Sequence, residues 1–433
     1  MSIRRVILFC TGLSLVAGAE EPLTLDQALA LAMAHNERAQ KAPLRVAVAE
    51  GSLDKARTAF YPTIAGQATG AWNSVADKAG RDLSANGQLT INQPLVNPSS
   101  FLLYGQARHA LASERFGATE DLRVLGFDTT NAFVTAIASE SLLAAAKHRL
   151  DRAKSDRDDL SARATAGLAS SNDVTRADLA VATAAGQVAS AVGSVERAYL
   201  SLGYLVGQPV KGPLVAPERT TNDAQHRTWN IDEVVHRAEG RRPDVLSAAE
   251  HTLALEDFAK EPLYRLAPTL SASANVRELF NPLPSDNVTT ATAQLNLVWT
   301  IYDAGVRYTD RRIRVAQAES GSLDERALRR TVATDIATAI ASLHASREVF
   351  RISVEAIANA AKNVDETAFL YSKGLAKAIE VTDANASRFD AEVTGAQAKL
   401  SMEQAYLNLR YALGLGPVAD ELPNPEHPAK DAR

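Results

Sequence analysis

The sequence predicts a mainly α-helical protein with a small β part, built as two tandem repeats that each combine short strands with very long helices. Three observations support this fold class: two long windows without proline, an internal repeat, and short segments of alternating polarity. The chain has 433 residues, of which 46% are hydrophobic and 22% charged. Such a composition can form a large core and excludes a globally disordered chain.

Very long helices are expected in the two windows that lack proline, between Pro98 and Pro209 and between Pro284 and Pro417. A proline inside a helix costs about 3 kcal/mol, and both windows are rich in good helix formers. A 68-residue helix would span on the order of 100 Å, so coiled-coil or bundle packing is expected. The expected helices cover about 99–166, 172–206, 304–373, and the stretch from a turn near Gly374 to about 413.

An internal repeat links the two windows. The segment GLASSNDVTRA at 167–177 aligns with GLAKAIEVTDA at 374–384, and 17 of the 41 positions from 167 to 207 are identical to their counterparts. Upstream, QLTINQPL at 88–95 matches QLNLVWTI at 294–301. A tandem duplication therefore covers the chain, and it is not a short-period solenoid.

The N-terminal residues have the layout of a secretory signal peptide. Arg4 and Arg5 precede a short apolar stretch that ends in Ala17-Gly18-Ala19, so we expect removal of residues 1–19. The single cysteine, Cys10, lies in this segment, which leaves the exported chain without disulfides. The expected domains are a first repeat at 20–212, a second repeat at 213–422, and a disordered tail at 423–433.

Four segments of about ten residues alternate between apolar and polar side chains, as amphipathic strands do. They lie at 63–72, 83–92, 269–277 and 290–297. Such strands are typical of a membrane sheet that faces lipid on one side and a wet lumen on the other, and equally of a small soluble sheet with one face on a core. Tyr61, Trp72, Trp299 and Tyr302 near the strand ends would suit an aromatic girdle.

Four strands are too few to close a barrel, and open sheet edges are not tolerated in lipid. If the strands span a membrane, several subunits must therefore share one barrel. A dimer would have eight strands and little lumen, whereas a trimer would have twelve strands and an open lumen.

These features together resemble the TolC-like outer-membrane efflux proteins over essentially the whole exported chain. The segments that carry the resemblance are LTLDQALALAMAHNE (23–37), ARTAFYPTI (56–64), QLTINQPLVNPSS (88–100), LVWTIYDAG (297–305), YSKGLAKAIEVTDA (371–384) and AYLNLRYALG (405–414). The resemblance implies a homotrimer with a twelve-stranded β-barrel in the lipid of the Gram-negative outer membrane and an α-helical barrel in the periplasm.

The resemblance also implies a passive channel that exports drugs, metal ions or proteins. Its expected partners are a periplasmic adaptor and an inner-membrane pump of the RND or ABC type, either in a tripartite efflux pump or in a type I secretion system. Because energy would come from the pump, the resemblance predicts no catalytic residue and no cofactor in this chain.

By the resemblance, the helical tips close the channel and acidic residues line the constriction, at the positions of Glu380 and Asp383. Tyr371 and Asp173 match positions that link neighbouring helical hairpins in the closed state. The basic partner in that link falls at Ala376, which cannot serve, and Lys377 one residue further along is the candidate substitute.

The same residues also have a simpler interpretation. Glu380 and Asp383 lie in the first turn of a helix, where the helix dipole favours acids and where acids often act as caps. Asp173 could equally be a helix cap. Threefold symmetry would turn each acid that faces an axis into a ring of three, which would favour cations at the constriction.

No enzymatic or metal-binding pattern is present in the sequence. It has no phosphate-binding loop, no H-E-x-x-H and no G-x-S-x-G, and none of its eight histidines lies within four residues of another. The net charge of −5 argues against nucleic acid as a partner. We expect RRPD at 241–244 and DERALRR at 324–330 to be solvated helix faces.

Two other classes of function remain open from the sequence. The leading alternative is an exported coiled-coil scaffold or adhesin with small sheets. An exported binding protein or enzyme is the other, although the chain offers no pattern of pocket residues for it.

Overall fold

The computed structural model describes residues 22–72, 74, 83–229, 231–280, 282, 286–420 and 422. The expected signal peptide at 1–19 and the expected tail at 423–433 lie outside these residues. Within the described part of the chain, no helix is both long and apolar enough to cross a membrane.

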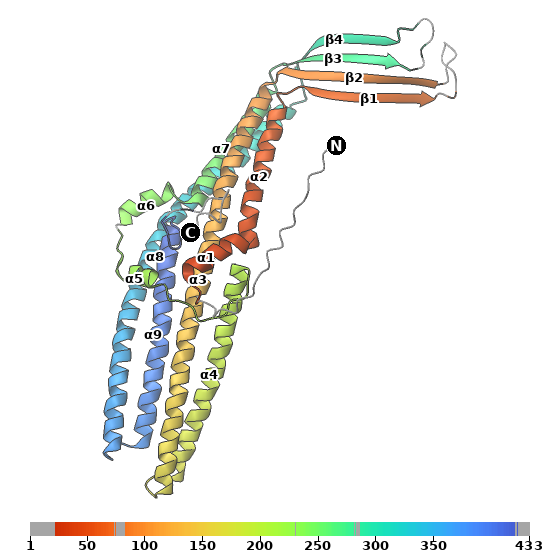
Figure 1. Ribbon diagram of the computed structural model, residues 1–433. Coiled ribbons are helices and arrows are strands. Elements are labelled where there is room, and N and C mark those ends of the chain that lie inside the picture. The colour runs from red at the N-terminus through yellow and green to blue at the C-terminus, as the bar shows by residue number, and fades with distance from the viewer. Residues whose placement is uncertain are drawn as a thin grey trace.

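Thirteen elements form an elongated molecule with a sheet at one end and two helical hairpins at the other (Figure 1). In chain order they are α1 (Leu25–His35), α2 (Glu37–Thr58), β1 (Thr63–Trp72), β2 (Leu83–Val96), α3 (Pro98–Thr165), α4 (Ser171–Val206), α5 (Glu218–His226), α6 (Ile231–Glu239), α7 (Pro243–Tyr264), β3 (Thr269–Leu279), β4 (Thr289–Val298), α8 (Val306–Ser372) and α9 (Ala378–Ala412).

The four long helices confirm the expectation from the proline-free windows. α3 has 68 residues and α8 has 67, and both run nearly the whole length of the helical part. α8 begins at Val306 and not at 304, because Ala304 and Gly305 have positive φ values of 56° and 86°. A right-handed helix cannot include residues in that conformation.

Shorter helices near the sheet accompany the long ones, and the proline-free windows do not predict them. α2 and α7 run beside the halves of α3 and α8 near the sheet, whereas α4 and α9 run beside the other halves (Figure 1). Pro43 lies inside α2 and Pro262 inside α7, so a search for proline-free windows cannot detect either helix.

The four strands form one antiparallel sheet in the order β1-β2-β3-β4. Each repeat supplies one hairpin, and the two hairpins join where β2 pairs with β3. β1 and β4 are the two edges of the sheet. All four strands were expected from the alternation of polarity, and their observed ends differ from the expected ones by at most four residues.

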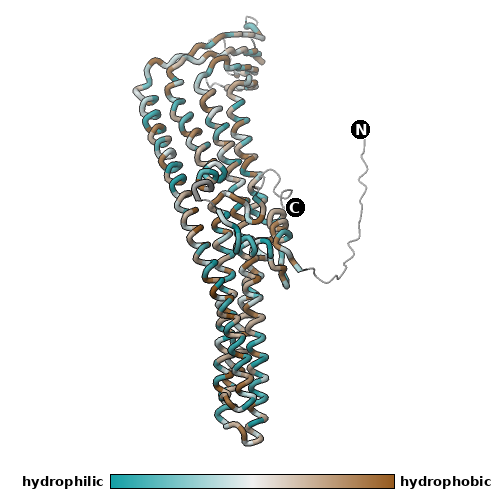
Figure 2. The backbone as a smooth tube through the Cα atoms, turned by 90° about the vertical axis from the view of Figure 1, so that its left-hand side faces the viewer, coloured by the Kyte–Doolittle hydropathy of each residue, from teal (hydrophilic) through white to brown (hydrophobic). Residues whose placement is uncertain are grey.

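Buried apolar side chains lie in several clusters along the helices, and hydrophobic and hydrophilic residues interleave along the tube (Figure 2). Val46, Leu53 and Leu122 pack α2 against α3. Ile336, Met402 and Leu409 pack α8 against α9. The core is therefore a series of helix seams that run along the molecule.

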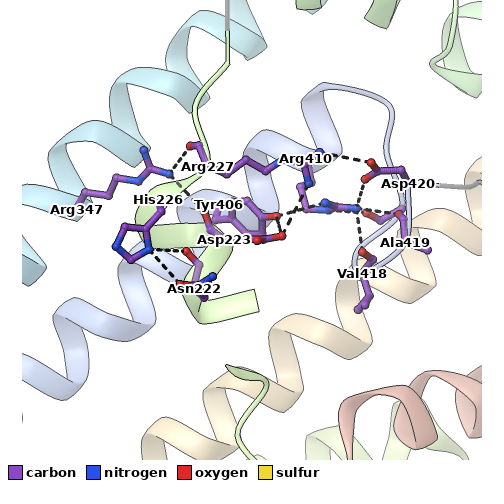
Figure 3. A network of polar contacts seen from close by, with 11 residues as sticks. Asn222, Asp223, His226, Arg227, Arg347, Tyr406, Arg410, Val418, Ala419 and Asp420 are labelled. Atoms are coloured by element: carbon purple, nitrogen blue, oxygen red, sulfur yellow. Dashed lines mark hydrogen bonds and ion pairs between the residues drawn. The ribbon is translucent and has the colours of Figure 1, made fainter. Parts of the chain in front are cut away.

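Halfway along the helices, Arg410 of α9 holds the segment that follows α9. This side chain is 1% exposed and donates to the carbonyl oxygens of Gly416 at 2.8 Å and Ala419 at 2.8 Å, and to Asp420 Oδ1 at 2.9 Å (Figure 3). Nearby, Arg347 of α8 donates to the carbonyl of Arg227 at 2.7 Å, which holds the end of α5. These contacts fix the C-terminal segment and α5 to the middle of the helices.

The expectation of a solvated face at 241–244 is wrong for Arg242. Its side chain is 4% exposed and pairs with Asp244 at 2.7 Å and Asp335 at 3.3 Å, at the N-terminus of α7. Burial by itself would raise the pKa of Asp244, but the hydrogen bond and charge of Arg242 outweigh it and lower this pKa. The sequence could not reveal this burial, because Asp335 is distant in the chain.

Candidate functional site

One face of the sheet is mainly apolar and the other is mainly polar. The register places Ile64 beside Ile91, and Leu89 beside Val276, on the same face. Side chains on this face are apolar yet exposed; Ile64 is 67% exposed and Leu295 70% exposed. Among the residues that the structure describes, no helix packs on this face.

The opposite face is polar. One row across the four strands consists of Thr63, Asn92, Ser273 and Gln294, and the next row contains Thr90, Asn275 and Thr292. Asn296 Nδ2 donates to Ser273 Oγ at 3.0 Å, which shows that these side chains hydrogen-bond with one another across strands. This polar face of the sheet is therefore suited to contact with water.

Aromatic side chains mark both ends of the apolar face. Trp72 ends β1 and Phe280 follows β3, and both are exposed at the end of the sheet far from the helices. Trp299 follows β4 at the helix end, where its Nε1 donates to the carbonyl of Leu266 at 2.9 Å. Tyr61 is also exposed near this end. The apolar face is thus bounded by aromatic residues at both ends.

At the other end of the molecule, both helical hairpins have the same tip turn. Gly167 and Gly374 adopt positive φ values of 77° and 74°. In the first hairpin the Leu168 N–H donates to the Arg163 carbonyl at 2.8 Å, and in the second the Leu375 N–H donates to the Leu370 carbonyl at 2.9 Å. This is the Schellman ending of a helix, present in both repeats.

The first tip has a capping box, in which Ser170 is the N-cap of α4 and Asp173 is its partner at the third helical position. The Asp173 N–H donates to Ser170 Oγ at 3.2 Å, and the Ser170 N–H and hydroxyl donate to Asp173 Oδ2 at 3.1 and 2.8 Å. These hydrogen bonds from Ser170 lower the pKa of Asp173. Asp173 therefore has a capping role in α4, while its proposed role in linking hairpins stays a prediction.

The second tip has no such cap. Lys377 stands at the N-cap of α9 and makes no side-chain capping hydrogen bond there. Glu380 occupies the position that corresponds to Asp173, and Asp383 corresponds to Arg176 in the first repeat. Both acids are exposed, and neither carboxylate has a hydrogen-bond or ion-pair partner among the described residues. Two carboxylates at this tip are thus free to act on something outside the subunit.

Tyr371 lies between the two hairpins, and a basic residue contacts it. The guanidinium of Arg163, in the last turn of α3, lies 4.5 Å from the centre of the Tyr371 ring. Arg163 Nε also donates to Asp159 Oδ2 at 2.9 Å. Burial raises the pKa of Tyr371; the nearby acids Asp159, Asp156 and Asp173 add to the rise, and Arg163 opposes it.

The sequence does not indicate Arg163 as the basic partner of Tyr371. No local pattern could identify it, because its contact joins the end of α3 to the end of α8, more than 200 residues away. Lys377, the expected substitute, is exposed at the turn between α8 and α9.

Further contacts continue along the seam between α3 and α9. Asn385 Nδ2 donates to Asp156 Oδ2 at 2.9 Å, and Arg152 donates to Asn385 Oδ1 at 3.3 Å. The guanidinium of Arg149 lies 4.7 Å from the centre of the Phe389 ring. Burial raises the pKa of Asp156, although Asn385 and Arg152 partly oppose this. These contacts hold the two hairpins of one subunit side by side.

The described part of the chain has no group of three or more His, Cys, Asp or Glu side chains placed to hold a metal ion.

Comparison with known proteins shows what this chain is similar to. Residues 234–415 match the model of the family described as outer membrane efflux protein. No curated protein matched the sequence.

Solved structures with a similar fold include outer membrane channels. VceC of Vibrio cholerae is 16% identical with a TM-score of 0.77, and the match covers 90% of this chain and 96% of that one. The CmeC outer membrane channel of Campylobacter jejuni is 13% identical with a TM-score of 0.78, covering 100% and 97%. The open state of the MtrE channel of Neisseria gonorrhoeae is 16% identical with a TM-score of 0.77, covering 92% and 90%.

Proposed function

We propose that this chain, which carries an outer membrane efflux protein domain and resembles the TolC-like channels as its sequence predicts, forms the passive exit duct of a tripartite efflux pump or a type I secretion system. Three subunits would share one twelve-stranded barrel in the outer membrane, and their helices would form a tunnel through the periplasm. The family and the related structures are channels and efflux proteins rather than enzymes, in agreement with a passive role.

The observation that carries this proposal is the four-stranded sheet with an uncovered apolar face and two unpaired edges, β1 and β4. In lipid, each unpaired backbone group costs several kcal/mol, so the edges must pair with other subunits. The aromatic residues at both ends of the apolar face fit the two interfaces of an outer membrane.

Exposed apolar side chains on the outer helices support the same assembly. α4 and α8 are the outermost helices at the tip end, because α3 and α9 pack between them (Figure 1). α4 exposes Leu200 and Tyr204, and α8 exposes Val349 and Ile352. A neighbouring subunit would cover these residues by packing its α8 against this α4.

The free acids at the second tip support a gated constriction. Three copies of Glu380 and Asp383 around an axis would form rings that attract cations. Asp173, Tyr371 and Lys377 would belong to the contacts that hold the tips closed.

The tips also offer a surface for the periplasmic adaptor. Leu168 and Leu375, at equivalent places in the two turns, are 78% and 74% exposed. Six such leucines would surround the tunnel entrance of a trimer, which suits an apolar contact with the adaptor. The inner-membrane pump, of the RND or ABC type, would supply the energy.

The division into repeats at 20–212 and 213–422 fits this duct. Each repeat supplies one strand hairpin and one long helical hairpin with the same tip turn. The proposed signal peptide at 1–19 would direct export to the periplasm.

The proposal is tested by fractionation and by ion conductance. Heat-resistant trimers in the outer-membrane fraction that conduct in planar bilayers would support the duct. A monomer in the soluble periplasmic fraction would contradict it and would favour an exported coiled-coil scaffold. In the trimer, replacing Glu380 and Asp383 together by alanine should reduce the preference for cations, and an unchanged preference would contradict the assignment of the constriction.

A further inference from the structure

We propose that Arg277 forms a ring of positive charge inside the extracellular end of the duct, so that the pore has opposite charges at its two ends and passes ions asymmetrically. This inference rests on the proposed trimeric duct and concerns the polar face of its sheet.

Charge is almost absent from the sheet. Arg277 and Glu278, adjacent in β3, are the only charged side chains in the described strands. Because side chains alternate along a strand, these two residues point to opposite faces. Glu278 lies on the apolar face with Val276, and Arg277 lies on the polar face with Asn275.

The neighbours of Arg277 on the polar face are uncharged. It pairs with Gln88 on β2 and Thr290 on β4, and Gln88 in turn pairs with Gln67 on β1. Arg277 is exposed and has no hydrogen-bond or ion-pair partner among the described residues. Its charge is therefore not neutralised within the subunit.

The depth of Arg277 follows from its position in the strand. It lies eight residues along β3 from Thr269, which begins the strand at the helix end. At about 3.4 Å per residue along a strand tilted by about 40°, this is roughly 21 Å along the membrane normal, close to the far edge of the apolar band of an outer-membrane barrel, which is about 25 Å tall. Glu278 on the lipid side fits this depth, since a carboxylate there would reach the headgroups.

Three such charges are close enough to act together. Twelve strands about 4.8 Å apart and tilted by about 40° give a barrel radius of roughly 12 Å. The arginine side chain extends inward over a large part of that radius. The remaining gap is comparable to the screening length of about 8 Å at physiological salt, so the field of the ring covers the lumen.

The sign of this ring is opposite to that of the acids at the second tip. Cations would be favoured where Glu380 and Asp383 lie and disfavoured where Arg277 lies. A pore with such a charge asymmetry conducts more current at one polarity of voltage than at the other, and the effect weakens as salt screens the charges.

Planar bilayers with trimers inserted in one direction test this inference. We compare the wild type with Arg277→Gln and Arg277→Lys, and use Glu278→Gln as the control, which removes a charge at the same depth from the other face. We measure current rectification in dilute and concentrated KCl, and block by inorganic tripolyphosphate added to the barrel side.

We expect Arg277→Gln to reduce rectification and to weaken tripolyphosphate block about tenfold. Arg277→Lys and Glu278→Gln should stay close to the wild type. If the wild type conducts but Arg277→Gln changes neither property, the inference is overturned while the duct stands. If trimers do not conduct at all, the proposed function itself fails.

A second measurement tests the orientation of Arg277 without conductance. Because Cys10 is the only cysteine and lies in the expected signal peptide, a single introduced cysteine can be labelled selectively. On intact cells, a water-soluble, membrane-impermeant thiol reagent should label Arg277→Cys and should label Val276→Cys, on the lipid face, much more slowly. The reverse order would overturn the inference.

Discussion

At the level of single residues, the two tip turns differ in how they use an acid at the same position. Asp173 is engaged by Ser170 in a capping box, whereas Glu380 follows a lysine N-cap and has no partner among the described residues. One acid therefore stabilises its own helix, and in the proposed duct its counterpart would contribute charge to the tunnel entrance.

This difference leads to a matched pair of substitutions. Asp173→Ala should destabilise the first turn of α4, because it removes the carboxylate that accepts hydrogen bonds from Ser170 in the capping box. Glu380→Ala should leave its helix unchanged and should lower the cation preference of the trimer. Amide hydrogen exchange at both turns and reversal potentials in a KCl gradient measure the two effects. Equal loss of protection in both variants would contradict these different roles.

A second residue-level prediction concerns which basic residue holds the tips together. A cation–π contact at a partly exposed site contributes about 0.5–1 kcal/mol. We therefore expect Arg163→Ala to increase the open fraction of the channel roughly two- to fivefold. Lys377→Ala is the matched comparison, since Lys377 is exposed at the neighbouring turn. Single-channel recording of both variants measures the open fraction, and a larger effect of Lys377→Ala would assign the lock to Lys377.

At the level of elements, α9 carries a buried acid that links stability to pH. Glu403 is 4% exposed, and burial raises its pKa, although the Thr221 hydroxyl and Lys399 partly oppose this. The folded state then holds this proton more tightly than the unfolded state. Its stability should fall as pH rises from the unfolded pKa, about 4.3, through the folded-state pKa, and stay level above it.

Glu403→Gln should therefore stabilise the protein at pH 7 and have little benefit at pH 4. Thermal unfolding of purified trimers at both pH values measures this. Glu348→Gln is a control with the opposite pH dependence. The hydrogen bond from Arg351 lowers the pKa of Glu348. Glu348 therefore stabilises the folded state at neutral pH, and this stabilisation is lost as pH falls through the folded-state pKa. A benefit of Glu403→Gln that is equal at both pH values would contradict the account.

The tip leucines provide a prediction for the contact with the adaptor. Leu168→Asp combined with Leu375→Asp should abolish crosslinking of the trimer to the adaptor in cells, because both side chains are exposed at the tips. Conductance of the purified trimer should be preserved, which serves as the control for folding. Retained crosslinking would exclude the tips as the docking surface.

The sequence predicts the helices and strands that are marked by a pattern among neighbouring residues. Proline-free windows identify α3, α4, α8 and α9, and alternation identifies all four strands. The same criteria miss α2 and α7, because each contains a proline. They also cannot recognise the contact between Arg163 and Tyr371 or the burial of Arg242, since these depend on residues brought together from distant parts of the chain.

At the level of the whole molecule, the fold divides the work between its two ends. In the proposed duct, the sheet would lie in lipid, and the long hairpins would place the charged entrance roughly 100 Å away, judged from the length of α3. Neither end is complete in one subunit: the sheet has two free edges, and a constriction requires acids from several subunits around an axis.

Cysteine crosslinking between sheet edges tests most directly whether subunits share one barrel. Ala65→Cys on β1 is combined in turn with a cysteine at each position from 290 to 296 on β4; within one subunit β2 and β3 separate these strands. We expect one register to give covalently linked dimers and trimers, and no larger species, in the outer-membrane fraction. Crosslinks within single subunits only, or none at any register, would contradict the shared barrel.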